Sequence, residues 1–374
     1  MSLKKSKTVY SKRKNKSKSN FRKVSNKKIN SWNKYGSVYS LKHKKYFSVI
    51  YKSTIPPFTV ENRCIPILKK KLAGKIDKNF NIIFNPEFLR EGNAIFDFEN
   101  PKRIILGVRT DKSKSILKEI YKQYKKKAKL IFVNIKTAEF IKYHSNAFFS
   151  LLISYSNEIS NLCHKIGVDY IDVYNAFKSD NRLTIKNQNP EFMNYMIPGI
   201  GYGGSCFPKD VKTFIKFAQD KNSKLSILKK VDKINSEQPE YISKIILKKF
   251  RDNKIKNCLV LGLTFKENTD DIRNSTSIDV INLLANGKTK IHVYDPIFSK
   301  KLFKKNKSFF NNKIQYQSKI NYSQNFDFIL VNNLSVEFEK IITYYEKNYK
   351  SLIFDSRRAF RHKKYKNYSG AGLI

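Results

Sequence analysis

The stretch Asn257-Cys-Leu-Val-Leu-Gly-Leu-Thr264 is an apolar run of the length of one β-strand. Such a continuous run is typical of a strand that is buried on both faces of a parallel sheet. Further apolar runs follow it, separated by longer stretches in which one helix is predicted. The runs are Lys290–Tyr294, Phe326–Val331 and Ser351–Phe354, and the helix is Ser275–Asn286. Strands that alternate with helices predict an α/β unit over residues 251–374.

The first part of the chain shows a similar alternation. Its predicted strands are Phe47–Lys52, Asn81–Phe84, Arg103–Val108 and Leu130–Val133, and a lysine-rich helix is expected over residues 112–126. From Thr137 to Ile166 a long helix is predicted without glycine or proline, ended by Gly167. We therefore expect an α/β fold with one α/β unit at 47–135, a central helical domain at 136–250 and a second α/β unit at 251–374.

The chain has 374 residues and a formal net charge of +45. Residues 1–46 contain 16 lysines and arginines and no acidic residue. Because this segment is rich in lysine and serine and poor in apolar residues, it is predicted to be a disordered tail. In the rest of the chain, the joint abundance of Lys, Asn, Ile, Phe and Tyr favours a compositional bias of the coding sequence over nucleic-acid binding. Contact of the tail with nucleic acid or acidic lipid stays open as an alternative.

The four cysteines, Cys64, Cys163, Cys206 and Cys258, lie far apart in the sequence. Their spacing argues against both a disulfide framework and a zinc site, so no metal is expected. The sequence has no apolar run of about 18 residues, the length that a membrane-spanning helix needs. It also has no apolar core of a signal peptide. We expect a protein of the reducing cytoplasm.

The segment Gly199-Ile-Gly-Tyr-Gly-Gly-Ser-Cys-Phe-Pro-Lys-Asp210 contains the spacing G-x-G-x-x-G. A dinucleotide fingerprint needs an apolar strand directly before it, and Pro198 argues against a strand here. The glycines instead predict a loop whose backbone approaches a ligand, with Cys206 at the start of a helix. There the helix dipole and Lys209 would favour the thiolate. A buried structural cysteine is the alternative.

Three pairs of polar residues are spaced by four positions, the spacing of residues that share a helix face. The pairs are Glu87/Glu91, Lys142/Asn146 and Cys206/Asp210. Each pair has a simpler explanation, since Lys142 can be a surface lysine with a packed stem and acids are common at helix starts. Together the pairs contain a nucleophile, a cation, an amide and three carboxylates, which are the groups that acyl-thioester chemistry uses.

Seven segments resemble the UDP-glucose/GDP-mannose dehydrogenase family, whose members use two NAD to oxidise the primary alcohol of a nucleotide sugar to a carboxylate. The segments occur in the family's order: Lys52-Ser-Thr-Ile-Pro-Pro57, Phe84-Asn-Pro-Glu-Phe-Leu-Arg-Glu-Gly92, Ala138-Glu-Phe-Ile-Lys-Tyr-His-Ser-Asn-Ala-Phe148, Gly201-Tyr-Gly-Gly-Ser-Cys-Phe-Pro-Lys-Asp210, Leu261-Gly-Leu-Thr-Phe-Lys-Glu-Asn-Thr-Asp-Asp-Ile-Arg273, Tyr294-Asp-Pro296 and Phe354-Asp-Ser-Arg-Arg358. The second and fourth segments are most similar to the UDP-glucose branch. The loop Ser179–Thr184 leaves the GDP-mannose and UDP-N-acetylhexosamine branches open.

The resemblance implies a catalytic role for several residues. Cys206 would attack the intermediate aldehyde, and the product would be oxidised to a thioester. Asp210 and Glu87 would place the water that hydrolyses it. Lys142 and Asn146 would stabilise the developing oxyanion.

The resemblance also implies the binding residues and the partners. NAD is the implied cofactor, with Thr54 acting beside the nicotinamide and Glu91 and Arg273 as further contacts. The implied substrate is a nucleotide sugar, UDP-glucose before others, bound by the C-terminal unit. The implied substrate-binding residues are Phe88, Leu89, Glu91, Arg182, Tyr195, Gly201, Phe265, Lys266 and Arg357. Arg182 would reach the site of a neighbouring subunit, because the helix from Thr137 would form the core of a homodimer.

The sequence departs from the family pattern at its start. Only 51 residues precede Lys52, so we expect a partial Rossmann-like unit that lacks the glycine-rich NAD loop and the first half of the NAD-binding domain. Smaller departures are Ser356 in place of a glycine and Val331-Asn-Asn-Leu334 in place of an acidic–aromatic pair. The first hypothesis is a nucleotide-sugar 6-dehydrogenase with impaired or partner-dependent catalysis. The alternative is a non-catalytic nucleotide-sugar binder.

Overall fold

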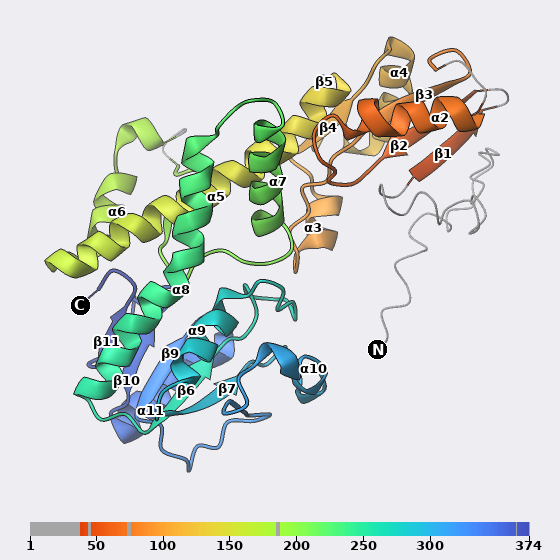
Figure 1. The fold of residues 1–374 in the computed structure, drawn as a ribbon. Helices are drawn as coiled ribbons and strands as arrows, with labels where there is room; N and C mark the ends of the chain where they lie inside the picture. The colour runs from red at the N-terminus through yellow and green to blue at the C-terminus, as the bar shows by residue number, and fades with distance from the viewer. Residues whose placement is uncertain (1–37, 44–45, 73–75, 185–187, 364, 374) are drawn as a thin grey trace. The chain divides into compact units, whose positions relative to one another are not determined.

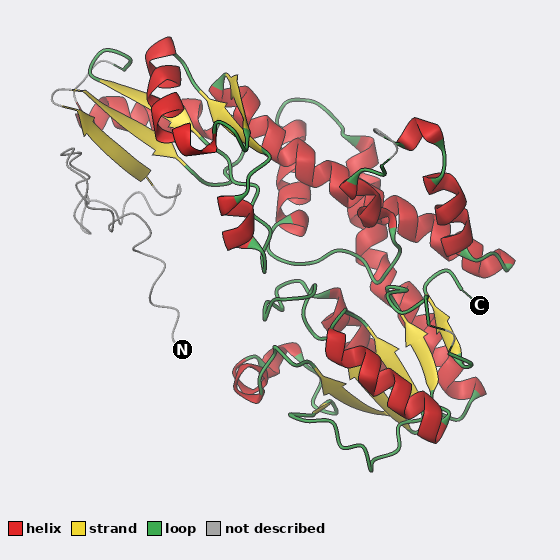
Figure 2. Cartoon of the chain, turned by 180° about the vertical axis from the view of Figure 1, so that it is seen from behind, coloured by secondary structure: helices red, strands yellow, loops and turns green. Residues whose placement is uncertain are grey.

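The computed structural model describes residues 38–43, 46–72, 76–184, 188–363 and 365–373 (Figure 1). The chain forms two compact units. The first comprises the residues up to Glu87 together with Asn100–Phe140, and the second comprises Phe88–Glu99 together with the residues from Ile141 onward. Each unit contains its own β-sheet with helices beside it (Figure 2). The predicted α/β fold class is thus confirmed.

The sheet of the first unit is mixed. Its strands, in the spatial order β1-β2-β3-β4-β5, are β1 (Val38–His43), β2 (Tyr46–Tyr51), β3 (Phe80–Phe84), β4 (Arg103–Gly107) and β5 (Lys129–Val133). The pairs β2–β3 and β4–β5 are parallel, whereas β1–β2 and β3–β4 are antiparallel. Every residue of β3 is buried. This burial explains why the sequence of β3 is nearly continuous in apolar residues.

Strand β1 corrects one expectation. The segment 1–46 was predicted to be disordered, but Val38–His43 pairs in antiparallel register with Tyr46–Tyr51. The prediction was wrong here because it weighed the lysines of the segment more than the strand propensity of Val38, Tyr39 and their neighbours. The rest of the predicted tail, residues 1–37, lies outside the described residues.

Helices follow the strands of the first unit. The helical turn η2 (Val60–Cys64) runs into α2 (Ile65–Leu72), and α4 (Asp111–Ile120) is followed by the turn η3 (Lys122–Tyr124). Helix α4 begins where the Thr110 hydroxyl accepts a hydrogen bond from the Ser113 amide, a side-chain cap. Its Leu117 packs on Ile104 and Leu106 of β4. The lysine-rich helix predicted for residues 112–126 is therefore confirmed as far as Ile120.

The second unit contains a fully parallel sheet. Its strands are β6 (Asn257–Leu261), β7 (Lys290–Tyr294), β8 (Gln315–Tyr316), β9 (Phe328–Val331), β10 (Leu352–Asp355) and β11 (Tyr368–Gly370). They lie in the order β11-β10-β9-β6-β7-β8, and each pair is parallel. This is the doubly wound arrangement, in which the strand order reverses between β6 and β9. Ligands bind beyond the carboxyl ends of the strands at such a point.

Both faces of this parallel sheet are covered. Cys258 and Val260 of β6 belong to the apolar cluster formed with α8 (Ser226–Asp252) and α9 (Thr276–Ala285). Leu259 and Leu261 belong to the opposite cluster, formed with α11 (Val336–Tyr349). All four side chains are 0% exposed, because successive residues of a strand point to opposite faces and each face meets a helix. Two short elements, α10 (Lys300–Lys305) and η6 (Lys307–Phe309), precede β8.

The remaining helical elements precede β6. They are α3 (Ala94–Glu99), α5 (Ile135–Ile166), α6 (Tyr170–Lys178), η4 (Asn181–Leu183), η5 (Glu191–Met196) and α7 (Phe207–Gln219). Helix α5 ends at Ile166, as predicted, because Gly167 adopts a left-handed conformation with φ of +79°. Within the ranges that the structure describes, no helix combines the length and the apolar character needed to cross a membrane.

Candidate active site

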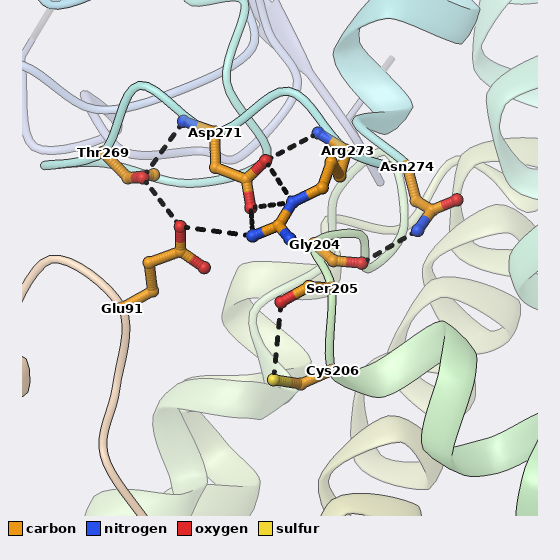
Figure 3. Close-up of polar contacts among 8 residues, drawn as sticks. All are labelled: Glu91, Gly204, Ser205, Cys206, Thr269, Asp271, Arg273 and Asn274. Atoms are coloured by element: carbon orange, nitrogen blue, oxygen red, sulfur yellow. Dashed lines mark hydrogen bonds and ion pairs between the residues drawn. The ribbon is translucent and has the colours of Figure 1, made fainter. Parts of the chain in front are cut away.

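Cys206 is the N-cap residue of α7. The Cys206 carbonyl accepts the Asp210 amide at 2.8 Å, and Pro208 lies in the first turn, where a missing N–H is harmless. The Cys206 side chain is exposed, with its Sγ 3.7 Å from the Ser205 hydroxyl (Figure 3), whereas the other three cysteines are buried. The predicted helix start is confirmed, and the alternative of a buried cysteine is wrong.

The glycines of the loop lie against another segment of the chain. A side chain at Gly203 would place its Cβ 2.1 Å from the Asn274 carbonyl, and one at Gly204 would meet the Phe265 ring at 2.7 Å. The Gly204 amide donates to the Arg273 carbonyl at 3.0 Å, and the Asn274 amide group donates to the Gly204 carbonyl at 3.0 Å (Figure 3). The glycines were predicted to let the backbone of the loop approach a ligand. In the structure, Gly203 and Gly204 let this backbone approach the segment that follows β6.

Two side chains of α8 hold the start of the same loop. The Asn235 amide group accepts from the Tyr202 amide at 2.7 Å and donates to the Tyr202 carbonyl at 3.0 Å. One turn later, Gln238 donates to the Gly199 carbonyl at 2.8 Å, while Asn157 of α5 accepts the Gly199 amide at 2.8 Å. Sequence reasoning missed these anchors, because polar residues three apart on a helix carry no sign of which backbone they bind.

A buried polar cluster lies next to Cys206. The Asp210 side chain is 1% exposed, accepts from Asn146 at 2.6 Å and pairs with the Lys209 ammonium at 2.5 Å. Lys142 lies one turn before Asn146 on α5, is 8% exposed and has its Nζ 5.1 Å from the centre of the Phe88 ring. The shared face of Lys142 and Asn146 is confirmed, and the surface explanation for Lys142 is wrong. Lys209 was expected to act on the thiol, but its ammonium is bound to Asp210.

A second charged cluster adjoins the glycine loop and contains Glu91, Thr269, Asp271 and Arg273 (Figure 3). The Arg273 guanidinium donates to both carboxylate oxygens of Asp271, at 2.9 Å from Nε and 2.7 Å from Nη2. Glu91 accepts a long hydrogen bond of 3.4 Å from Thr269, and its carboxylate is 3.9 Å from Nη2 of Arg273. The sequence analysis named Glu91 and Arg273 but not Asp271 or Thr269.

Burial and charge act differently on the two acids of this cluster. Burial, followed by repulsion from Asp271, raises the pKa of Glu91 above its usual value. Burial alone would raise the pKa of Asp271 too, but its hydrogen bonds from Arg273 bring that pKa below the usual value. The same hydrogen bonds raise the pKa of Arg273. The two carboxylates thus compete for one guanidinium, and Asp271 forms the stronger interaction with it.

The expectation that Glu87 and Glu91 share a helix face is wrong. Residues 85–90 form no helix, and α3 begins only at Ala94. The segment ends in a turn at Gly92, whose left-handed φ of +80° separates it from α3. Glu87 belongs to the first unit and Glu91 to the second.

In the first unit, Thr54 and Glu87 follow the ends of two neighbouring strands. Strands β2 and β3 are parallel, with Tyr51 opposite Phe84, so their carboxyl ends lie at one edge of the sheet. The Lys52 ammonium ties the two segments together by donating to the Asn85 side chain at 3.0 Å. The carboxyl edge of a parallel strand pair is where α/β proteins bind nucleotides.

Arg357 spans the carboxyl ends of the other sheet. Its guanidinium donates to the Asn332 carbonyl, beyond β9, at 2.9 Å and to the Phe265 carbonyl, beyond β6, at 3.1 Å. Burial lowers the pKa of Arg357 and also that of Lys266. Ser356 stands 3.0 Å from the Asn332 side chain, so the two smaller departures from the family pattern are in contact.

The other residues implied by the resemblance are more dispersed. Tyr195 stacks on Phe149, with 4.4 Å between ring centres, and burial raises the pKa of its hydroxyl. Leu89 is 37% exposed, and Gly201, with φ of +105°, lies against Asn235. Arg182 has a largely exposed side chain that pairs with Asp180 at 2.6 Å.

Three models of one protein family match the chain. The model described as the UDP-glucose/GDP-mannose dehydrogenase family, NAD binding domain, matches residues 36–125; the central domain matches residues 136–237; and the UDP binding domain matches residues 259–362. The NAD binding domain match begins before β1 and so includes that strand.

Curated relatives and solved structures agree with these matches. UDP-glucose 6-dehydrogenase of Rickettsia felis is 38% identical over 67% of this chain and 53% of the relative, and that of Rickettsia bellii is 39% identical over 69% and 57%. The structure of a UDP-glucose dehydrogenase from Pyrobaculum islandicum has a TM-score of 0.74 and 29% identity, covering 88% of this chain and 71% of that one. The chain spans just over half the length of these curated relatives. With three successive domain models matched in order, the chain belongs to the UDP-glucose/GDP-mannose dehydrogenase family.

Proposed function

We propose that this chain is an NAD-dependent nucleotide-sugar 6-dehydrogenase that oxidises UDP-glucose to UDP-glucuronate. The observation that carries the proposal is the exposed Cys206 at the start of α7, next to the buried cluster of Asp210, Asn146 and Lys142. A binding protein has no use for an accessible thiol beside a buried acid and two donors. The relatives named UDP-glucose 6-dehydrogenase support UDP-glucose as the substrate over other nucleotide sugars.

In the proposed mechanism, Cys206 is the nucleophile. Its sulfur adds to the carbonyl carbon of the aldehyde intermediate, and oxidation of that adduct leaves a thioester on Cys206. Lys142 and Asn146 stabilise the oxyanion that forms in each addition, with hydrogen bonds that strengthen as negative charge develops. Asp210 orients water and takes its proton as the thioester is hydrolysed, and the sulfur departs as thiolate.

The residues of the first unit support NAD as the cofactor. When bound, NAD accepts the hydride from the sugar carbon. Thr54, at the shared carboxyl edge of β2 and β3, would lie beside its nicotinamide, and Glu87 follows β3 at the same edge. The family resemblance also implies Glu91 and Arg273 as cofactor contacts. Phe265, Lys266 and Arg357, beyond the carboxyl ends of the parallel sheet, would hold the nucleotide sugar, together with Phe88, Leu89, Tyr195 and Gly201.

The test is NADH formation by the full chain with UDP-glucose, compared with GDP-mannose and UDP-N-acetylmannosamine. UDP-glucose is expected to be the best substrate. The Cys206→Ser variant is expected to produce no uronate while it still binds UDP-glucose. Cys163→Ser is the matched control, because it makes the same change at a buried cysteine and is expected to keep activity. Uronate production by Cys206→Ser at the rate of the unmodified chain would contradict the thioester mechanism.

The apolar face of α5 supports a homodimer. Four residues between Phe148 and the end of this helix are large, apolar and substantially exposed: Phe148 (39%), Tyr155 (50%), Leu162 (51%) and Ile166 (62%). Their spacing of seven and four residues places them on one stripe of the helix. In a dimer, the exposed Arg182, which pairs with Asp180 in its own chain, would reach the neighbouring subunit's site. Light scattering of Leu162→Lys is expected to show a smaller species than the unmodified chain, and an unchanged mass would contradict this interface.

A further inference from the structure

Asp271 makes an unusually complete contact with Arg273. One oxygen of the Asp271 carboxylate accepts both the Arg273 backbone amide, at 2.9 Å, and its Nε, at 2.9 Å, while the other accepts Nη2 at 2.7 Å. The Asp271 side chain is 8% exposed and that of Arg273 is 63% exposed. A buried acid therefore fixes the orientation of an exposed cation, since a bidentate contact to a guanidinium restricts its rotation.

Asp271 is itself held in place by the segment that follows β6. Its backbone amide donates to the Thr269 hydroxyl at 3.1 Å, and its carbonyl accepts the Phe265 amide at 3.2 Å. The Thr269 hydroxyl is also the donor to Glu91. The contact between Asp271 and Arg273 is thus built into a segment in which Thr269 also contacts Glu91.

Glu91 interacts more weakly with the Arg273 guanidinium than Asp271 does. Its carboxylate is 3.9 Å from Nη2, which is beyond hydrogen-bond distance, whereas Asp271 binds the same nitrogen at 2.7 Å. Two carboxylates and one guanidinium leave a net negative charge at this point. The pKa of Glu91 is raised in part by repulsion from Asp271, in agreement with the geometry.

The same cluster is joined to the Cys206 loop through the backbone. The Arg273 carbonyl accepts the Gly204 amide, and Asn274 donates to the Gly204 carbonyl, two residues before the sulfur. Figure 3 shows Arg273 between Glu91 and this loop. The other charged groups at the start of α7, Lys209 and Asp210, are paired with each other. Charge interaction with Cys206 is one of the causes that raise the pKa of Arg273, so the guanidinium and the Cys206 side chain influence each other.

We propose that Asp271 is a positioning residue of the active site, which holds the Arg273 guanidinium between Glu91 and the Cys206 loop and offsets its positive charge there. The inference rests on the proposed function in that it takes Cys206 as the nucleophile. By offsetting the charge of Arg273, Asp271 weakens the attraction between that cation and negative charge on the Cys206 side chain. It also prevents Arg273 from forming a full ion pair with Glu91.

The test is the pH dependence of Cys206 alkylation by iodoacetamide in the full chain, followed by mass spectrometry of the Cys206 peptide at low ionic strength. In Asp271→Asn the midpoint is expected to move to lower pH by roughly 0.5–1 unit, the range for removing one charge beside a partly exposed group. Arg273→Gln is expected to move it in the opposite direction. High salt should reduce both shifts, because it screens partly exposed charges.

Asp270→Asn is the matched control, since it removes the same charge from the next residue, whose side chain is exposed. Its expected shift is clearly smaller than that of Asp271→Asn. Equal shifts in the two variants, or no shift in Asp271→Asn, would overturn the proposal. If Asp271→Asn does not fold, as judged by thermal melting, Arg273→Gln is the test that remains. A shift of its alkylation midpoint to lower pH, or no shift, would overturn the proposal. The measurement needs neither NAD nor sugar, so the absence of dehydrogenase activity would refute the proposed function without touching this result.

Discussion

Glu139 and Asp210 are buried acids that the two units hold in different ways. In the first unit, Glu139 of α5 is 0% exposed and accepts the backbone amides of Phe58, at 2.6 Å, and Val60, at 2.9 Å. In the second unit, Asp210 accepts from the side chains of Asn146 and Lys209. Both carboxyl groups are removed from water, but only Asp210 is paired with a cation.

The difference separates an architectural acid from one that is available for chemistry. Glu139 fixes the loop after β2, where Phe58 adopts a left-handed conformation with φ of +66°. Its donors are backbone groups that cannot move away, and burial raises its pKa to about 7. The partners of Asp210 are side chains, one of them on an exposed lysine, and such partners can rearrange when a substrate arrives.

Replacing Asp210 should have the largest effect if this distinction is right. Asp210→Asn keeps the size of the side chain but cannot take a proton. Formation of uronate is expected to fall by about 10²–10⁴, the usual range for loss of a general base. Steady-state rates measured with UDP-glucose test this, with thermal melting as the check on folding. A loss of less than about threefold would mean that Asp210 is as structural as Glu139.

Lys142 should have the next largest effect. It lies on α5 one turn after Glu139, but it belongs to the cluster around Phe88 and Asn146. Lys142→Met keeps most of the side-chain volume and removes the charge, so the rate is expected to fall by about 10²–10³, as for other oxyanion donors. Lys136→Met is the control on the same helix, because Lys136 pairs with Glu61 and is half exposed. Equal rates for the two variants would remove Lys142 from the oxyanion site.

Glu139 should control stability and its pH dependence. Because the folded-state pKa is raised to about 7, the folded chain favours the neutral form. The stabilisation is complete below the unfolded pKa of about 4.5 and is lost as pH rises through 7, a change of up to about 3 kcal/mol in the free energy of unfolding. Urea unfolding at pH 5 and pH 8 tests this. Glu139→Gln should remove most of the difference, and an unchanged difference would assign it to other groups.

Lys209 should show the smallest effect. Its side chain is 53% exposed, so its ion pair with Asp210 is partly screened by water. Lys209→Met is expected to lower the free energy of unfolding by less than about 1 kcal/mol, as measured by urea unfolding. A larger loss would show that the exposed lysine holds Asp210 as firmly as the backbone holds Glu139.

The sequence predicted those features that depend on local pattern. The buried run at Asn257–Leu261, the helix that ends at Ile166 and the cysteine at the start of α7 each follow from residue types close together in the chain. The shared face of Lys142 and Asn146 follows from helical spacing alone. These are the parts of the fold and of the candidate site that short-range physical rules determine.

The features that were missed depend on contacts between distant segments. Nothing near Gly203 indicates that it lies against Asn274, and nothing near Asp271 indicates that its turn faces Glu91. The pairing of Glu87 with Glu91 failed because helical spacing was applied to a segment that forms no helix and ends in a turn at Gly92. Strand β1 was missed because composition outweighed strand propensity.

The amide anchors from α5 and α8 have a consequence for isotope labelling. The Gly199 and Tyr202 amide protons lie in a glycine-rich loop, where rapid exchange with deuterium is the usual behaviour. Both are donated to side-chain oxygens, of the buried Asn157 and the half-buried Asn235. Their exchange should therefore be slow, and its rate would report how often the loop separates from the side chains of α5 and α8.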